Sequence, residues 1–248
     1  MTFGAFCSQG AEVTAQAVVL TVQGPVTVVT KDGTTAVMKA GDKLSVGTVI
    51  TTGPGGAADI QVFNGAVATI RPDTTCNVEK LSVTTSGGVV TKQTALLDLK
   101  VGTIASNIDP ANHNINDYGI RTPTGVAAAR GTAYTVNVTP NGRTQVFVSS
   151  SAITFSVTVN GVTTSQTVPA NSQITVSGTG VVTVVQLTGA ALQQAKDEGH
   201  PVNKENAPNV TVTPTGNNNH SGNDTDKGNT PAILILDPVS PSGGSMPQ

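Results

Sequence analysis

Charge and aromatic side chains are both scarce in this sequence. Only 11% of the 248 residues are charged, against about 25% in a typical globular protein. Aromatic residues make up 3% of the chain, and tryptophan is absent. A net charge of −2 supplies no basic surface, and so few rings supply no stacking platform for nucleic acid. We therefore expect no nucleic-acid partner, and the shortage of rings also weakens the case for a carbohydrate-binding surface.

Side chains that bind metals or carry redox chemistry are few as well. Three histidines and two cysteines are present, and His200 and His220 have no partner at the spacing of a zinc site. Cys76 lies within a threonine- and valine-rich run, which is typical of a small buried apolar residue. The sequence therefore predicts no metal, no cofactor and no disulfide.

Long apolar runs are missing too. No stretch approaches the roughly 20 apolar residues that cross a bilayer as a helix, so we expect no transmembrane segment. Near the N-terminus, Ala15-Gln16-Ala17 has the small-x-small form of a signal-peptidase site. We interpret residues 1–17 as the remnant of an export signal or, alternatively, as a disordered tail. An export signal would place the protein in the periplasm of a bacterium or outside the cell.

What the sequence does contain is alternation. From residue 18 to residue 187, short runs of valine, isoleucine and threonine with a period of two are separated by turn signals every 8–12 residues or so. The clearest turn pairs are Asp32-Gly33, Asn64-Gly65, Gly87-Gly88, Asn141-Gly142 and Asn160-Gly161. This pattern predicts an all-β domain over residues 18–187, an antiparallel sandwich or a barrel-like fold.

The pattern changes after Leu187. Residues 188–200 have the composition of one short helix, ended by Gly199-His200-Pro201. Residues 201–248 form a polar tail that we expect to be disordered, because it has too few apolar groups to offset its ordering entropy. Within it, the apolar segment 232–239 is expected to add a strand to an open edge of the core or to pair with another chain.

Several of these segments, taken in order, resemble the FecR domain, an all-β module of bacterial envelope proteins. They are GPVTVV (24–29), the glycine-bounded stretch 40–74, LLDLKVGTI (96–104) and IRTPTGVAAARGTAYTVNV (120–138). The namesake FecR proteins are transmembrane sensors that control a sigma factor. Because no membrane-spanning run is present, the chain resembles the stand-alone exported type, without the transmembrane and cytoplasmic anti-sigma segments.

The signature of this resemblance contributes six candidate residues with a structural or a partner-binding role. They are Thr122, Pro123, Gly125, Arg130, Gly131 and Thr132. Proline and glycine suit a tight turn, and the five N–H donors of Arg130 suit either of two roles. One is a buried strut paired with Asp59, Asp73 or Asp98, which we favour. The other is a contact to a ligand or partner.

The irregular stretch 107–119 is the first choice for a ligand site, because functional residues favour loops on rigid scaffolds. Its candidate residues are Asp109, Asn112, His113, Asn114 and Asp117, with Asn116 beside them. Their oxygens could hold calcium, but the spacing does not match an EF-hand. An ordinary polar loop is the preferred interpretation.

No catalytic constellation emerges from the remaining residues. The serines at 149–151 have no histidine or aspartate near them in sequence, and the glycine-rich stretch 53–56 lacks the lysine of a phosphate loop. Asp73 and Glu79, on either side of Cys76, are expected to face solvent. We therefore expect a non-enzymatic envelope or extracellular module, structural or interacting with an envelope protein or a cell-wall component. The alternative is a periplasmic sensing component of a system linked to a sigma factor.

Overall fold

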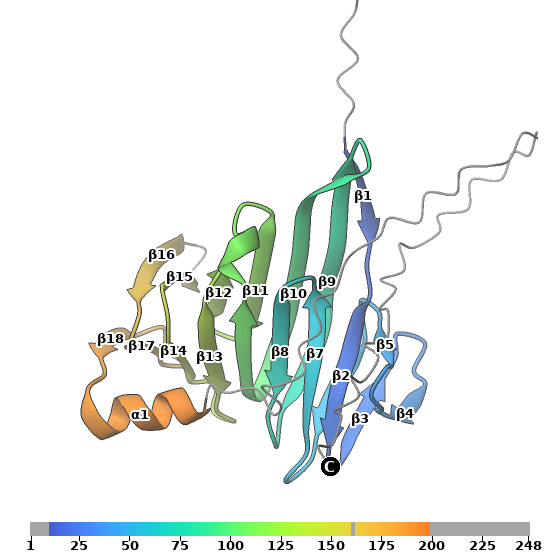
Figure 1. Cartoon of the computed structure of the whole chain (residues 1–248). Coiled ribbons are helices and arrows are strands. Elements are labelled where there is room, and N and C mark those ends of the chain that lie inside the picture. Colours follow the sequence, from blue (N-terminus) through green and yellow to red (C-terminus); the bar gives the residue numbers. More distant parts are fainter. Residues whose placement is uncertain (1–9, 160–161, 199–248) are drawn as a thin grey trace, which may run out of the picture.

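A computed structural model describes residues 10–159 and 162–198 (Figure 1). The tail at 201–248, its apolar segment 232–239 and the turn Asn160-Gly161 lie outside the described residues. Within these ranges the chain is almost entirely β-structure, and its strands form two sheets that share one long strand, β10 (Val89–Ile108).

Sheet A follows the order β4, β3, β6, β9, β10, β11, β12, β15, β16, and β1 pairs with the far end of β9. Its strands are β1 (Ala11–Thr14), β3 (Val26–Val29), β4 (Thr35–Val37), β6 (Val49–Thr52), β9 (Thr75–Ser86), β11 (Asn116–Thr122), β12 (Gly125–Ala129), β15 (Ala152–Val159) and β16 (Val162–Pro169).

Sheet B follows the order β5, β2, β7, β8, β10, β13, β14, β17, β18. Its strands are β2 (Ala17–Gln23), β5 (Lys43–Leu44), β7 (Ala57–Phe63), β8 (Ala66–Ile70), β13 (Ala133–Val138), β14 (Thr144–Val148), β17 (Ser172–Val176) and β18 (Val182–Gln186).

Strand β10 passes from one sheet to the other at Gly102. Its first part pairs with β9 and β11 in sheet A, and residues 102–107 pair with β13 in sheet B. Gly102 has φ 99°, and a Cβ there would meet Thr74 Oγ1 at 2.3 Å. Only glycine allows this bend, because the conformation is left-handed and the backbone of the preceding turn lies against it.

The core lies between the two sheets, as the alternation predicts. Inward-facing Ile60, Ile70, Leu97 and Ile104 are completely buried, and the few aromatic rings gather at the centre. Tyr118 packs edge-on against Phe63 and Tyr134, with ring centroids 6.2 Å apart in both pairs. The expected all-β sandwich with one short helix is therefore confirmed. The expectation of purely antiparallel pairing is wrong at one place, because β10 and β11 run parallel.

The turn pairs behave as glycine chemistry requires. Gly33, Gly65, Gly88 and Gly142 have φ between 80° and 87°, where a side chain is disfavoured. At the first of these turns, the Asp32 carboxylate accepts hydrogen bonds from its neighbours, including the Thr34 amide at 3.2 Å. These hairpins set the strand registers.

The N-terminal boundary differs from the expected one. Residues 11–14 form β1 and pair with β9, and the side chains of Ala15 and Ala17 are buried. The expectation that all of residues 1–17 lie outside the domain is therefore wrong for residues 11–17. The two small residues of the small-x-small pattern thus belong to the folded core.

Helical structure is limited to the 3₁₀ turn η1 (Pro110–Asn112) and to α1 (Gly189–Glu198), which falls inside the range predicted for the helix. Within the described residues, no helix has the length and apolar character needed to cross a membrane.

Candidate functional site

The RTPTG segment forms the hairpin between β11 and β12. Thr122 faces Gly125 across a loop of two residues, and its Oγ1 accepts a hydrogen bond from the Gly125 amide at 3.2 Å. Thr124 Oγ1 donates to Thr144 Oγ1 at 2.7 Å, which ties the loop to β14 in the other sheet. Pro123 is exposed at the tip. This end of the hairpin is therefore held by hydroxyl contacts between the sheets.

Both glycines of the signature lie where another chain segment approaches closely. A Cβ at Gly125 would meet the Ser156 carbonyl oxygen at 2.3 Å, and a Cβ at Gly131 would meet Pro110 Cα at 2.7 Å. The second contact brings the RGT segment against η1, so the signature and the candidate loop lie side by side. Both glycines are thus needed for packing.

Thr132 fixes the other side of Arg130. It is buried, and its hydroxyl donates to the Ser150 carbonyl, while the Ile108 amide donates to the Thr132 carbonyl at 3.0 Å. Ser150 Oγ in turn accepts from the Ala133 amide at 3.1 Å. The backbone around Arg130 is therefore anchored to three neighbouring segments.

Arg130 itself is exposed, so the favoured interpretation as a buried strut is wrong. Ala127 and Ala129 face the core, and the alternation of β12 turns Ala128 and Arg130 to the outer face of sheet A.

None of the three expected partners neutralises Arg130. Asp98 pairs with Lys100 at 2.6 Å, Asp59 accepts from the Thr21 hydroxyl at 2.9 Å and from the Thr69 hydroxyl at 2.6 Å, and Asp73 is exposed in a turn. Small residues on both sides of an arginine therefore gave no reliable indication of burial.

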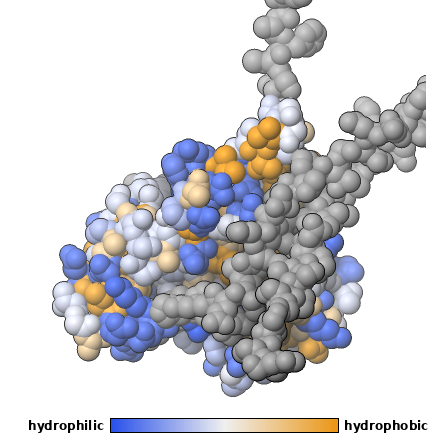
Figure 2. Space-filling view, viewed as in Figure 1, coloured by the Kyte–Doolittle hydropathy of each residue, from blue (hydrophilic) through white to orange (hydrophobic). Residues whose placement is uncertain are grey.

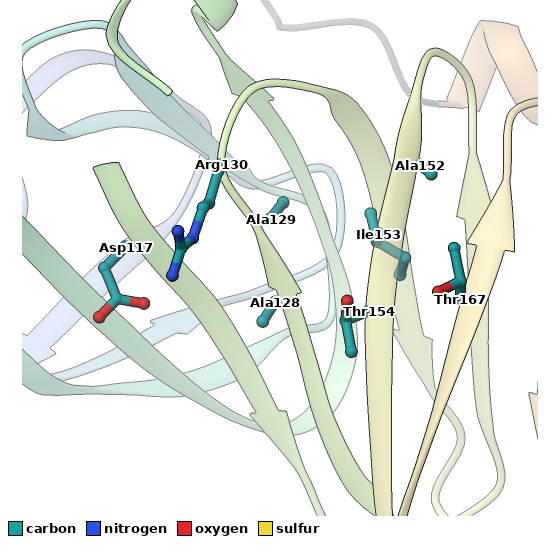
Figure 3. A pocket seen from close by; sticks show the side chains of 8 residues that line it. All are labelled: Asp117, Ala128, Ala129, Arg130, Ala152, Ile153, Thr154 and Thr167. Carbon is teal, nitrogen blue, oxygen red and sulfur yellow. The ribbon is translucent and has the colours of Figure 1, made fainter. Parts of the chain in front are cut away.

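Arg130 lies at the rim of a shallow groove on the outer face of sheet A, with a volume of about 470 Å³ (Figure 3). The groove is lined by Asp117, Ala128, Ala129, Arg130, Ala152, Ile153, Thr154 and Thr167. Ala128, Thr154 and Thr167 stand in one row across β12, β15 and β16. This row supplies small side chains and hydroxyl groups, with Ile153 beside them and the guanidinium of Arg130 at one side.

The other cations on this sheet are neutralised. Lys92 pairs with Asp117 at 2.8 Å, Arg121 with Glu79 at 2.9 Å and Lys80 with Glu12 at 3.3 Å. Arg130 forms no ion pair with any residue in the described ranges. Although Asp117 lines the same groove, its charge is already matched by Lys92. Of the two charged side chains in the groove, Asp117 is therefore paired with Lys92, and Arg130 has no ion-pair partner among the described residues.

Polar side chains of the candidate loop at 107–119 form hydrogen bonds with other groups of the protein. The Asp109 carboxylate accepts from the Ala111 amide at 2.8 Å and begins η1, and His113 Nδ1 lies 3.0 Å from the Pro110 carbonyl. Asn116 is buried and accepts from Gln93 at 3.2 Å.

The remaining members of that loop do not complete a ligand set. Asn114 is exposed, and Asn112 is half-buried at the end of η1. Across the described residues, no three histidine, cysteine or acidic side chains come together in a way that would hold a metal ion.

The reactive side chains elsewhere have structural surroundings. Burial raises the pKa of the Cys76 thiol to about 12, with Asp98 adding to the effect, so the thiolate is suppressed at neutral pH. Ser149 Oγ donates to the Ala133 carbonyl at 2.8 Å. Asp73 faces solvent as expected, whereas Glu79 is half-buried and paired with Arg121.

Sequence reasoning did not find the groove residues that come from β15 and β16. Thr154 and Thr167 come from β15 and β16, and Ala152 begins β15. Only the pairing of β12 with β15 brings them beside Arg130. No local motif marks them, because exposed threonines are ordinary on strands.

Solved structures and a family model resemble parts of this chain. Two crystal structures of a "putative anti-sigma factor" from Parabacteroides distasonis ATCC 8503 match with TM-scores of 0.44 and 0.43, at 14% and 16% sequence identity. Each match covers 56% of this chain and 59% of the other. A search among curated proteins finds no match.

The family match covers β6 to the start of β15, and so it includes the β11–β12 hairpin, η1 and Arg130. The model concerned is described as FecR protein, and it matches residues 48–154. The centre of this chain, residues 48–154, is therefore similar to the FecR domain.

Proposed function

We propose that this chain is a non-enzymatic binding module of a regulatory sensing system at the bacterial envelope, and that it engages a protein partner through the groove beside Arg130. The observation that carries the proposal is the exposed, unneutralised Arg130 on a rigid corner of the FecR domain. Arginine at such a position is suited to a bidentate contact with a carboxylate.

Rigidity supports a binding role for this corner. Gly131 lies against Pro110, and Thr132 is hydrogen-bonded to Ser150, so the guanidinium is carried by backbone that has little freedom. A preorganised contact loses less conformational entropy when a partner binds. The flat floor of Ala128, Thr154 and Thr167 lets a partner's backbone approach closely without moving large side chains.

Electrostatics supports a carboxylate-bearing partner. Lys80, Lys92 and Arg121 are matched on the same sheet, so Arg130 provides the local excess of positive charge. Electrostatic complementarity of this kind mainly sets specificity and association rate. The match of residues 48–154 to the FecR family model supports the regulatory context, and an exported location beside an envelope signalling protein is part of the same proposal.

Affinity capture tests the proposal. The purified full chain is immobilised and exposed to the envelope fraction of its own organism, alongside Arg130→Gln and Arg143→Gln. Arg143 is the matched control because it is exposed in the β13–β14 turn of sheet B.

We expect a protein retained by the wild type and by Arg143→Gln but lost with Arg130→Gln. Equal retention by all three would contradict the assigned groove. Retention of nothing but cell-wall glycan would contradict the protein-binding role.

A further inference from the structure

Both sheets have an open edge at the same end of the molecule. β16 is the last strand of sheet A and β18 the last strand of sheet B, and both lie at the left in Figure 1 with α1 below them. Each pairs on one side only within the described residues. An edge strand presents unpaired backbone N–H and C=O groups, which favour the addition of another strand.

The β18 edge is the apolar one. Val182, Val184 and Val185 are 39%, 36% and 52% exposed, and Val181 before them is 64% exposed. Apolar surface is visible at this end of the molecule in Figure 2. Val182 and Val184 face Val176 and Ile174 of β17 across the strand pair, so they continue the rows that form the core. They are core-type residues without a covering neighbour among the described elements.

Natural edge strands are usually protected against pairing with other chains, and the edge strands at the opposite end of this sandwich have such protection. There, β4 has 3 residues and β5 has 2, and Lys43 lies in β5. Very short strands and lysine are two of the devices that prevent edge-to-edge pairing. By contrast, β16 has 8 residues and β18 has 5, and neither contains a charged residue. The β18 strand also lacks proline.

This composition selects the kind of partner. In a two-fold symmetric pairing, each strand meets its own copy, so any charge would meet a like charge nearby. We infer that β18 pairs antiparallel with β18 of a second copy of this chain, in a register centred on Val184. Thr183 then faces Val185 of the partner, Val182 faces Gln186, and the two Val184 side chains meet on the axis.

The uncharged edge of β16 enlarges the contact. Thr163 and Ser165 are exposed and uncharged, and they lie at the same end of the sandwich. The two edge strands contain 8 and 5 residues, fewer than the roughly 20–30 per partner of a standard interface. A dimer of modest affinity, continuous through sheet B, is the expected result. The Arg130 groove includes Thr167 of β16 but no residue of β18, so the β18 pairing is separate from the proposed function.

Sedimentation velocity of the full chain, from about 1 to about 200 µM, tests the dimer, together with Val184→Lys and Val37→Lys. The first variant places two ammonium groups on the two-fold axis, where their repulsion should weaken the dimer at least about ten-fold, equivalent to about 1.4 kcal/mol. The second places the same charge on β4 at the opposite end, where Val37 is 65% exposed, and should leave dimerisation unchanged. Thermal unfolding of both variants checks that they fold.

A wild type that stays monomeric to the highest concentration overturns the inference. Equal weakening by the two substitutions also overturns it, since the charge and not the position would then be responsible. Hydrogen exchange of the β18 amides tests for a different occupant of this edge. Protected β18 amides in a monomer would overturn the pairing with a second copy and would indicate a segment of the same chain on β18.

Discussion

Gly125 lies where two strands of sheet A approach each other, and its absent side chain is what allows them to pair. A methyl group there would meet the Ser156 carbonyl at 2.3 Å and the Phe155 ring at 3.1 Å. We predict that Gly125→Ala lowers the free energy of unfolding by about 1–3 kcal/mol, because buried backbone must move to make room. Urea unfolding measures the change.

The matched control for this substitution is Gly178→Ala. A Cβ at Gly178 would lie 3.3 Å from its nearest neighbour, the Asn141 carbonyl oxygen. Gly178 itself is exposed in the β17–β18 turn and is not enclosed between strands. A loss of stability at Gly178 equal to that at Gly125 would contradict the close-approach explanation.

Buried acidic groups predict a loss of stability in base. Burial raises the pKa of Cys76 from 9.0 to about 12, and burial also raises the pKa of Tyr118 and of Tyr134 above its usual value of 10.0. A raised pKa means that the folded state favours the protonated form. The stabilisation is complete below the unfolded pKa and is lost as pH rises through the folded one.

We therefore predict that the free energy of unfolding is level near neutral pH and falls from about pH 9 upward, by roughly 1.4 kcal/mol per pH unit for each titrating group. Urea unfolding between pH 7 and pH 11 measures it. Cys76→Ala removes the first group to titrate and should reduce the slope between pH 9 and pH 10. The same slope in both proteins would show that the thiol is not the cause.

At the scale of single elements, β1 connects the N-terminal residues to the fold. Val13 faces Val83 of β9 and packs against the core. We predict that Val13→Asp lowers the free energy of unfolding by about 1–3 kcal/mol, because a carboxylate would be placed against apolar neighbours. Thr14→Asp, at an exposed position of the same strand, should have little effect. If both variants unfold like the wild type, β1 is not part of the folded domain.

The elements also show how far the sequence alone predicts this protein. Period-two alternation and the Asn-Gly and Asp-Gly turns were sufficient for the strands and for most hairpins, because both are local properties. The parallel pairing of β10 with β11 was not predictable in the same way. It follows from the bend at Gly102, which depends on contact with Thr74 from a separate turn.

The candidate site was predicted only in part, for a related reason. The signature marked the correct hairpin, since its glycines and its proline carry visible constraints. Arg130 is exposed because it lies, with Ala128, on the face of β12 that points away from the core. The groove forms because β15 pairs with β12. Alanine and threonine neighbours occur on either face of a strand, so their identity does not decide the direction.

At the scale of the whole molecule, the interactions proposed above occupy different surfaces. The groove beside Arg130 lies on the outer face of sheet A, and the β18 edge lies at one end of sheet B. The two are independent unless a partner is large enough to cover both. Substitutions in one should leave the other intact, so Val184→Lys should retain the partner that Arg130→Gln loses.

The central claim is that Arg130 contacts a protein partner and does not hold the fold together. Isothermal titration of the captured partner tests it most directly, with the wild type, Arg130→Gln and Arg143→Gln compared at equal thermal stability. Because Arg130 is exposed, its loss should change the free energy of unfolding by less than about 0.5 kcal/mol. We predict that the dissociation constant rises at least about ten-fold for Arg130→Gln and stays unchanged for Arg143→Gln. An unchanged dissociation constant for Arg130→Gln, or a loss of stability that accounts for weaker binding, would contradict the claim.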